Sequence, residues 1–415
     1  MASIIGMLQL LIFLFLAYRA ILKKSKIVDV FIYNYVCGIL NSKFWGSVPW
    51  LNIGISLYPG DFWILLLLFL MLIRGTKLKK NIGVGFIFIF VMLSGISGIR
   101  GIAQNGLSSD FLSDFRIYTY FGISILFFAN ENINYDWIKI EKKLSILFKW
   151  LSLYILVLLL FHFAGIHVGF YLDDRPILSD YIIIYAAFTA YKWYKDLVLR
   201  KSNYLSVQTL YMTVLLILNR YNTTWIALLG SVFMLILFRY KDKSKKKFHR
   251  IFYVQILVLV VGILSVLTLL KGTAVMDELA ANMDKFDASS DNTFTTRIEI
   301  WTAILATYTG INALIGFPFG NGYRILYRGD IWKHTPHNGY IEMAGRIGYI
   351  GVCIIVLLCV LSVIKSLRRK EILPMMLIVT MMIYWSAYSI TLEQGVILGA
   401  CIRYLFRRNK NVSNY

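Results

Sequence analysis

Residues 346–366 read RIGYIGVCIIVLLCVLSVIKS, an apolar run whose charged residues lie near its two ends. A helix of about 20 such residues spans the hydrocarbon core of a bilayer. Comparable runs recur along the 415-residue chain, of which 58% is hydrophobic and 16% charged. This composition excludes a soluble globular protein and predicts an all-α polytopic membrane protein.

The apolar runs predict about 12 to 14 transmembrane helices. The predicted spans are residues 4–22, 27–42, 61–74, 82–99, 115–130, 144–164, 180–196, 204–220, 223–239, 251–271, 346–366, 372–387 and 389–406. They divide the chain into the N-terminal spans of residues 1–271, a large loop with interfacial helices at 272–345, and the C-terminal spans of 346–415.

Basic residues are clustered in alternate connections between these runs. The clusters lie near residues 23–26, 74–80, 139–143, 192–201, 239–250, 365–370 and 403–410. Cytoplasmic loops carry the excess of Lys and Arg, so these connections are predicted inside and the loop 272–345 outside. The formal net charge of +21 therefore indicates membrane topology and not nucleic-acid binding.

The cytoplasmic clusters are mostly lysine, whereas the outward or intramembrane basic positions are mostly arginine. These are Arg100, Arg116, Arg175, Arg220, Arg297, Arg324, Arg328 and Arg346. The planar guanidinium binds phosphate or carboxylate through two N–H groups, which favours an anionic ligand at the outer surface. The alternative for any one arginine is an interfacial contact with lipid phosphates.

The large loop contains the most informative motifs. Thr296-Arg297 opens a helical pattern in which Trp301 lies one turn later, as a residue suited to an interfacial anchor. Glycines between Gly316 and Gly322 predict a tight turn and a close approach of the backbone to another segment.

A second motif, Thr335-Pro336-His337-Asn338, precedes the span at 346–366. Thr335 can cap a helix with Pro336 at its first position, which would place His337 in the first turn, where backbone N–H groups favour an anion. His337 is then a candidate base beside a phosphate group. No carboxylate or cysteine completes a metal site with His334, and no nucleotide motif is present, so no cofactor is predicted.

Two further arginines lie at predicted outer ends of spans. Arg220 falls in a tight turn between two helices without an adjacent acid, which makes it a candidate ligand for an anionic substrate. Arg116 has Asp114 two residues earlier, and a local ion pair between them is the favoured interpretation.

With these motifs the chain resembles the bacterial superfamily of O-antigen polymerases and ligases. The resemblance rests on Arg220 at the outer turn, on Thr296-Arg297 followed by Trp301, and on Gly320 to Gly322 followed by His337-Asn338-Gly339-Tyr340-Ile341 and the glycine run from Gly345 to Gly351. Asn219 stands where the family often has Ser, and Ala344-Gly345-Arg346 replaces the usual Glu-Gly.

The resemblance implies a GT-C-like, metal-independent glycosyltransferase of the bacterial inner membrane, with its active site on the periplasmic side. Its donor and acceptor would carry sugars on undecaprenyl diphosphate, with membrane lipids and a chain-length regulator as further partners. Catalysis would fall to His337, Arg297 and Arg220. Substrate binding would fall to Arg116, Asn338, Tyr340, Arg324 and Arg328.

The sequence is compatible with three functions. The leading prediction is a polymerase of O-antigen or capsular repeat units. The amino-acid usage fits an AT-rich gene and the sequences that flank the motifs are divergent, and both features are typical of polymerases. An O-antigen ligase, which transfers the chain to lipid A core, shares the same motifs. A flippase for lipid-linked sugars is the alternative from another class, although Glu393 is the main carboxylate predicted within a span and transporters usually carry more.

Overall fold

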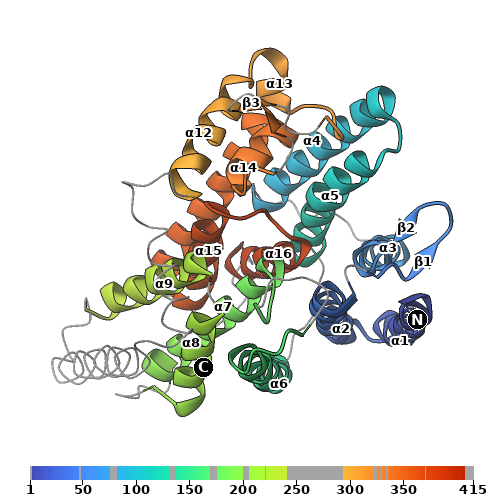
Figure 1. The fold of residues 1–415 in the computed structure, drawn as a ribbon. Coiled ribbons are helices and arrows are strands. Elements are labelled where there is room, and N and C mark those ends of the chain that lie inside the picture. The colour runs from blue at the N-terminus through green and yellow to red at the C-terminus, as the bar shows by residue number, and fades with distance from the viewer. Residues whose placement is uncertain are drawn as a thin grey trace.

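The computed structural model describes residues 2–45, 48–74, 82–130, 137–168, 175–199, 205–219, 221–240, 293–321, 325–327, 330–332, 335–369 and 371–406. Across these ranges the chain is helical apart from two small antiparallel hairpins (Figure 1). Short 3-10 or π segments extend three helix ends, at η1 (Lys24–Lys26), η2 (Asn41–Trp45) and η3 (Lys195–Leu199).

The N-terminal helices form a group beside the main bundle (Figure 1). It consists of α1 (Ala2–Leu22), α2 (Ile27–Leu40), the hairpin of β1 (Leu51–Asn52) and β2 (Ser56–Leu57), and α3 (Pro59–Ile73). The Gln9 and Asn41 side-chain amides exchange hydrogen bonds of 2.9 and 3.0 Å, and the Trp50 indole donates to Gln9 at 2.8 Å. These reciprocal bonds satisfy polar groups that an apolar medium would leave unpaired.

The centre of the molecule is built from α4 (Ile82–Asn105), α5 (Ser109–Asn130), α14 (Gly339–Arg369) and α16 (Leu392–Phe406). Helices α5 and α16 pack closely against each other, and Gly395 and Gly399 lie one turn apart on α16. A Cβ atom at either glycine would come within 2.7 Å of a carbonyl oxygen of α5. Small residues at this spacing let two helix backbones approach each other, which lipid-exposed packing favours.

Five further described helices extend this bundle. They are α6 (Trp137–Phe163), α7 (Ser179–Tyr194), α8 (Val207–Leu218), α9 (Asn222–Tyr240) and α15 (Ile372–Trp385). Helix α15 packs against α7, α9 and α14, and the hydroxyls of Ser231 and Thr380 bond to each other between α9 and α15.

The described part of the large loop forms a small unit at one end of the bundle (Figure 1). It contains α12 (Thr293–Ala306), α13 (Gly310–Ile315) and the hairpin of β3 (Ile325–Tyr327) and β4 (Asp330–Trp332). Buried Ile300 and Ile304 of α12 pack with Ile341 and Ala344 at the start of α14. This apolar contact holds α12 against the end of a membrane helix.

Hydropathy predicted the helices well. Each predicted span except 251–271 falls on a described helix, and 251–271 lies outside the described residues. Among the described residues, five helices are long and apolar enough to cross a membrane: Ile4–Leu22, Gly83–Asn105, Ser109–Asn130, Glu141–Phe163 and Gly339–Arg369. The protein is therefore an all-α polytopic membrane protein, as predicted.

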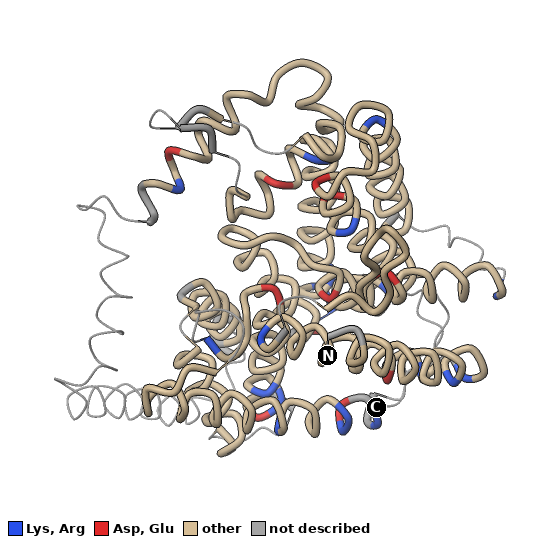
Figure 2. Tube along the Cα trace, turned by 45° about the vertical axis from the view of Figure 1, so that its right-hand side comes forward, with Lys and Arg blue, Asp and Glu red and all other residues tan. Residues whose placement is uncertain are grey.

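Lys and Arg residues are concentrated toward the end of the bundle opposite α12 and α13 (Figure 2). Lys143 of α6 pairs there with Asp29 at the start of α2, and Lys195 pairs with Glu141. These ion pairs tie neighbouring helices together at the basic end.

Candidate functional site

The two motifs of the large loop meet where α12 passes the start of α14. The Trp301 indole N–H donates a 2.7 Å hydrogen bond to the carbonyl oxygen of Pro336, the residue before His337. Arg297 is half-buried and lies four residues before Trp301 on α12, so both occupy the same side of that helix. Trp301 and Pro336 are 35 residues apart in sequence, and their hydrogen bond makes the arginine motif and the histidine motif neighbours in the fold.

The structure corrects the predicted position of His337. The helix begins at Gly339 and its cap is Asn338, whose Oδ1 accepts from the backbone N–H groups of Tyr340 at 3.0 Å and Ile341 at 3.1 Å. Thr335 is therefore not the cap. His337 precedes the helix with φ of 51°, a left-handed conformation that costs free energy for a side-chain-bearing residue, and its side chain is exposed.

We call the meeting point of Arg297 on α12 with His337 and its neighbours the His337 corner. Asn338 and Tyr340 connect this corner to α15. The Asn338 side-chain N–H donates to the Ser386 carbonyl at 3.1 Å, and the Tyr340 hydroxyl donates to the Met382 carbonyl at 2.8 Å. Both residues were predicted to bind substrate. Because their polar groups donate to the backbone of α15 and its C-cap residue, we interpret them as positioning residues that fix the backbone beside His337.

Arg220 lies outside the described residues, but its neighbours on both sides are described. The Asn219 side chain donates to and accepts from the backbone of Ile177, at 3.1 Å in each direction. The Tyr221 ring lies edge-on to Tyr388 at 5.7 Å, and the Arg175 guanidinium lies over the Tyr221 ring at 4.3 Å. Tyr388 follows the Ser386 carbonyl that binds Asn338, so the turn between α8 and α9 adjoins the His337 corner.

Arg116 has a different partner from the one predicted. Its Nε is 2.8 Å and its Nη2 3.0 Å from the two carboxylate oxygens of Asp61 on α3, and Nη2 also donates to the Ser56 carbonyl at 2.6 Å. A local pair with Asp114 was the wrong prediction, because residues two apart on a helix point in different directions. Arg116 instead fastens α5 to α3 and to the β1–β2 hairpin.

Asp114 pairs across the molecule with Arg346 of α14, with 2.8 Å between Oδ1 and Nε. Its other oxygen, Oδ2, accepts the backbone N–H of Gly320 at 2.8 Å. Arg346 is only 4% exposed. The sequence indicated Arg346 as an outward arginine, but the partner could not be predicted because 231 intervening residues separate it from Asp114.

The predicted turn at residues 316–322 is confirmed over its described part, as is its close approach to another segment. Gly316 and Gly320 both have φ of 90°, and a Cβ atom at Gly316 would lie 2.2 Å from the Arg346 carbonyl oxygen. Arg100 donates to the Gly316 carbonyl at 2.8 Å, and the Asn105 amide donates to Phe319 O at 2.8 Å. The end of α4 therefore holds this turn against α14.

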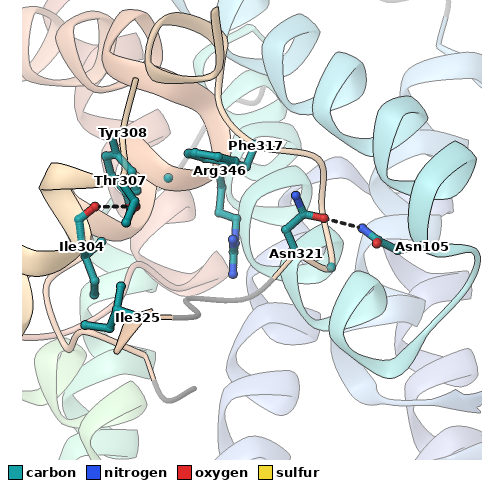
Figure 3. Close-up of a pocket in the computed structure, with 10 residues that line it drawn as sticks. Asn105, Ile304, Thr307, Tyr308, Phe317, Asn321, Ile325 and Arg346 are labelled. Atoms are coloured by element: carbon teal, nitrogen blue, oxygen red, sulfur yellow. Dashed lines mark hydrogen bonds between the residues drawn. The ribbon is translucent and has the colours of Figure 1, made fainter. Parts of the chain in front are cut away.

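A cavity of about 390 Å³ lies between this turn, the end of α12 and α14 (Figure 3). The Arg346 side chain points into it, between Asn321 and Ile325 (Figure 3). Tyr308 lines one wall and donates its hydroxyl to the Ile341 carbonyl at 3.1 Å. Burial raises the pKa of the Tyr308 hydroxyl, which therefore stays protonated as a donor.

Glu342 in α14 and Glu393 in α16 are buried acids in the first turns of their helices, at 2% and 5% exposure. A helix N-terminus stabilises negative charge at this position. Glu393 was predicted to lie within a span, whereas Glu342 was not, because the predicted span began at residue 346 and left Glu342 in the loop.

Other predicted positions lie outside the described residues, namely Arg324, Arg328 and His334. Within the described ranges, no group of three or more His, Cys, Asp or Glu residues is placed to hold a metal ion.

Residues 208–356 match the protein family described as O-antigen ligase. No curated protein matches the chain. The matched segment runs from α8 into α14 and so contains Arg297, Trp301 and His337, together with the residues that line the cavity other than Asn105. This match supports the resemblance to the superfamily of O-antigen polymerases and ligases that the motifs predicted.

Proposed function

We propose that this protein is a GT-C-like polymerase that joins undecaprenyl-diphosphate-linked repeat units of an O-antigen or capsular polysaccharide. The main support is the Trp301–Pro336 hydrogen bond, which brings the helix of Arg297 to the loop of His337. A base and a cationic group at one corner suit a transfer in which a hydroxyl attacks and a diphosphate leaves.

In this reaction the acceptor hydroxyl oxygen forms a bond to the anomeric carbon of the donor sugar, and the bond from that carbon to the diphosphate oxygen breaks. The hydroxyl proton passes to His337, whose exposed side chain is accessible to an acceptor. Arg297 and Arg220 neutralise the charge that develops on the leaving diphosphate. Diphosphate is a stable leaving group, so no nucleotide or metal is required in this scheme.

The charge distribution supports an orientation with this corner in the periplasm. Lys and Arg residues are more frequent toward the opposite end of the bundle (Figure 2), and the more basic side of a bacterial inner-membrane protein faces the cytoplasm. Lipid-linked repeat units would therefore be joined on the outer face of the inner membrane. A chain-length regulator is a further candidate partner there.

The test uses purified protein in nanodiscs with undecaprenyl-diphosphate-linked repeat units and neither metal nor nucleotide. We expect a ladder of products on a gel, at least 100-fold reduced in Arg297→Ala and in His337→Ala. Transfer that requires added lipid A core would identify the protein as a ligase. A ladder that both variants retain would contradict the proposed site.

A further inference from the structure

The cavity around Arg346 lies apart from the corner of His337, yet the same two helices reach both. Arg297 and Thr307 are ten residues apart, which corresponds to roughly 15 Å along a helix of 1.5 Å rise per residue. On α14, Arg346 lies about two turns after the cap at Asn338. The cavity is thus rigidly connected to the proposed reaction site without overlapping it.

The cavity walls combine polar groups with apolar surface. Amides of Asn105 and Asn321, hydroxyls of Thr307 and Tyr308, and the guanidinium of Arg346 supply donors and acceptors. The apolar part comes from Ile304, Phe317 and Ile325. The rings of Tyr308 and Phe317 lie 5.6 Å apart at an angle of 48°. A volume of about 390 Å³ falls in the range of small-molecule sites.

The charge of the cavity is balanced. Arg346 is the one described lining residue with a formal charge near neutral pH, and Asp114 lies 2.8 Å from its Nε. An anion would be attracted by Arg346 and repelled by Asp114. A neutral ligand rich in hydroxyls, by contrast, uses the fixed amide and guanidinium groups as hydrogen-bond partners without an unbalanced charge.

We propose that this cavity is a saccharide subsite, which binds a neutral sugar ring of the lipid-linked chain away from the bond being formed. The inference rests on the proposed function for the identity of the chain, although binding itself does not require catalysis. Thr307 is exposed at the cavity edge, so a sugar has access from the aqueous side. The subsite would fix the position of the saccharide chain along the protein while the reacting end of that chain lies at His337.

Thr307→Trp is the variant that tests this subsite, because its larger side chain fills the cavity from an exposed position. Thr302→Trp is the matched control. Thr302 is also an exposed threonine of the α12 region, its hydroxyl donates to Ile298 O at 2.8 Å as that of Thr307 donates to Ile304 O at 2.7 Å, and it does not line the cavity. Thr307→Phe is a smaller filling variant that serves if the tryptophan impairs folding.

The measurement is fluorescence anisotropy of a labelled repeat-unit oligosaccharide, freed of its lipid by mild acid, with the full-length protein in nanodiscs. We expect at least tenfold weaker binding in Thr307→Trp and Thr307→Phe, and unchanged binding in Thr302→Trp. Equal binding by all variants, no binding by the unmodified protein, or displacement by inorganic diphosphate would overturn the subsite.

The gel assay separates this inference from the proposed function. A normal ladder together with unchanged binding in Thr307→Trp refutes the subsite alone. Loss of oligosaccharide binding in Thr307→Trp, with no ladder from the unmodified protein, supports the subsite and refutes the polymerase.

Discussion

At the scale of single residues, the geometry around His337 depends on bonds made by its neighbours. Pro336 accepts from Trp301, and Asn338 caps α14 while donating to Ser386. These bonds hold His337 in its left-handed conformation between two fixed residues. The His337 imidazole is therefore attached to a constrained backbone, which reduces the conformational entropy that this segment loses when an acceptor binds.

Trp301→Phe removes the bond to Pro336 while keeping an aromatic ring in place. A hydrogen bond of this kind contributes about 0.5 to 1.5 kcal/mol, so the initial rate of ladder formation should fall by a factor between roughly 2 and 13 if the bond aligns the site. Trp150→Phe, at a 66% exposed position on α6, is the control and should retain the full rate. Equal rates in the two variants would show that the bond does not position the site.

Arg116→Ala should chiefly reduce stability. It leaves the carboxylate of Asp61, whose side chain is 6% exposed, without its guanidinium partner, and we expect a loss of about 1 to 3 kcal/mol. Thermal unfolding in detergent measures this loss. The double variant Arg116→Ala with Asp61→Asn should recover part of it, because no buried charge remains. A double variant no more stable than the single one would argue against the ion pair as the cause.

At the scale of elements, α14 changes direction at Gly348, where φ is 72° and ψ 171°. A Cβ atom at this residue would lie 2.0 Å from the Leu314 carbonyl oxygen of α13. The change of direction in α14 therefore makes room for the backbone of α13. Both the backbone angle and the contact distance require glycine at this position.

Gly348→Ala should lower the stability of the protein by about 3 kcal/mol or more, since it combines backbone strain with a clash against main-chain atoms. Gly85→Ala in α4 is the matched control, because nothing lies within 4 Å of its added Cβ atom. That control should be neutral or stabilising by up to about 1 kcal/mol. The two thermal unfolding midpoints decide the comparison, and similar midpoints would contradict the packing described.

The elements also show what the sequence could and could not predict. Membrane helices were predictable because apolar length determines them, and the Gly316 turn was predictable from its glycines. The start of α14 was misplaced, because the choice between Thr335 and Asn338 as cap depends on bonds to a helix far along the chain. The Asp114–Arg346 pair likewise depends on tertiary packing, which local spacing does not encode.

At the scale of the whole molecule, the proposed reaction and transport across the membrane lead to different outcomes in cells. A strain with both Arg297→Ala and His337→Ala should accumulate unpolymerised lipid-linked repeats on the outer face, because their export is separate from their joining. Labelling of intact cells with a membrane-impermeant lectin measures this pool. Repeats that become accessible only after lysis would instead indicate a flippase.

The seam between α13 and α14 has a consequence for how such a protein can diversify. Main-chain atoms of Leu314 and Arg346 make the close contacts there, and two glycines accommodate them. Backbone atoms are the same in every sequence, so this junction places little demand on the side chains around it. Residues that face the cavity can then be substituted as the sugars of the polymer change, while the backbone junction between α13 and α14 keeps its conformation.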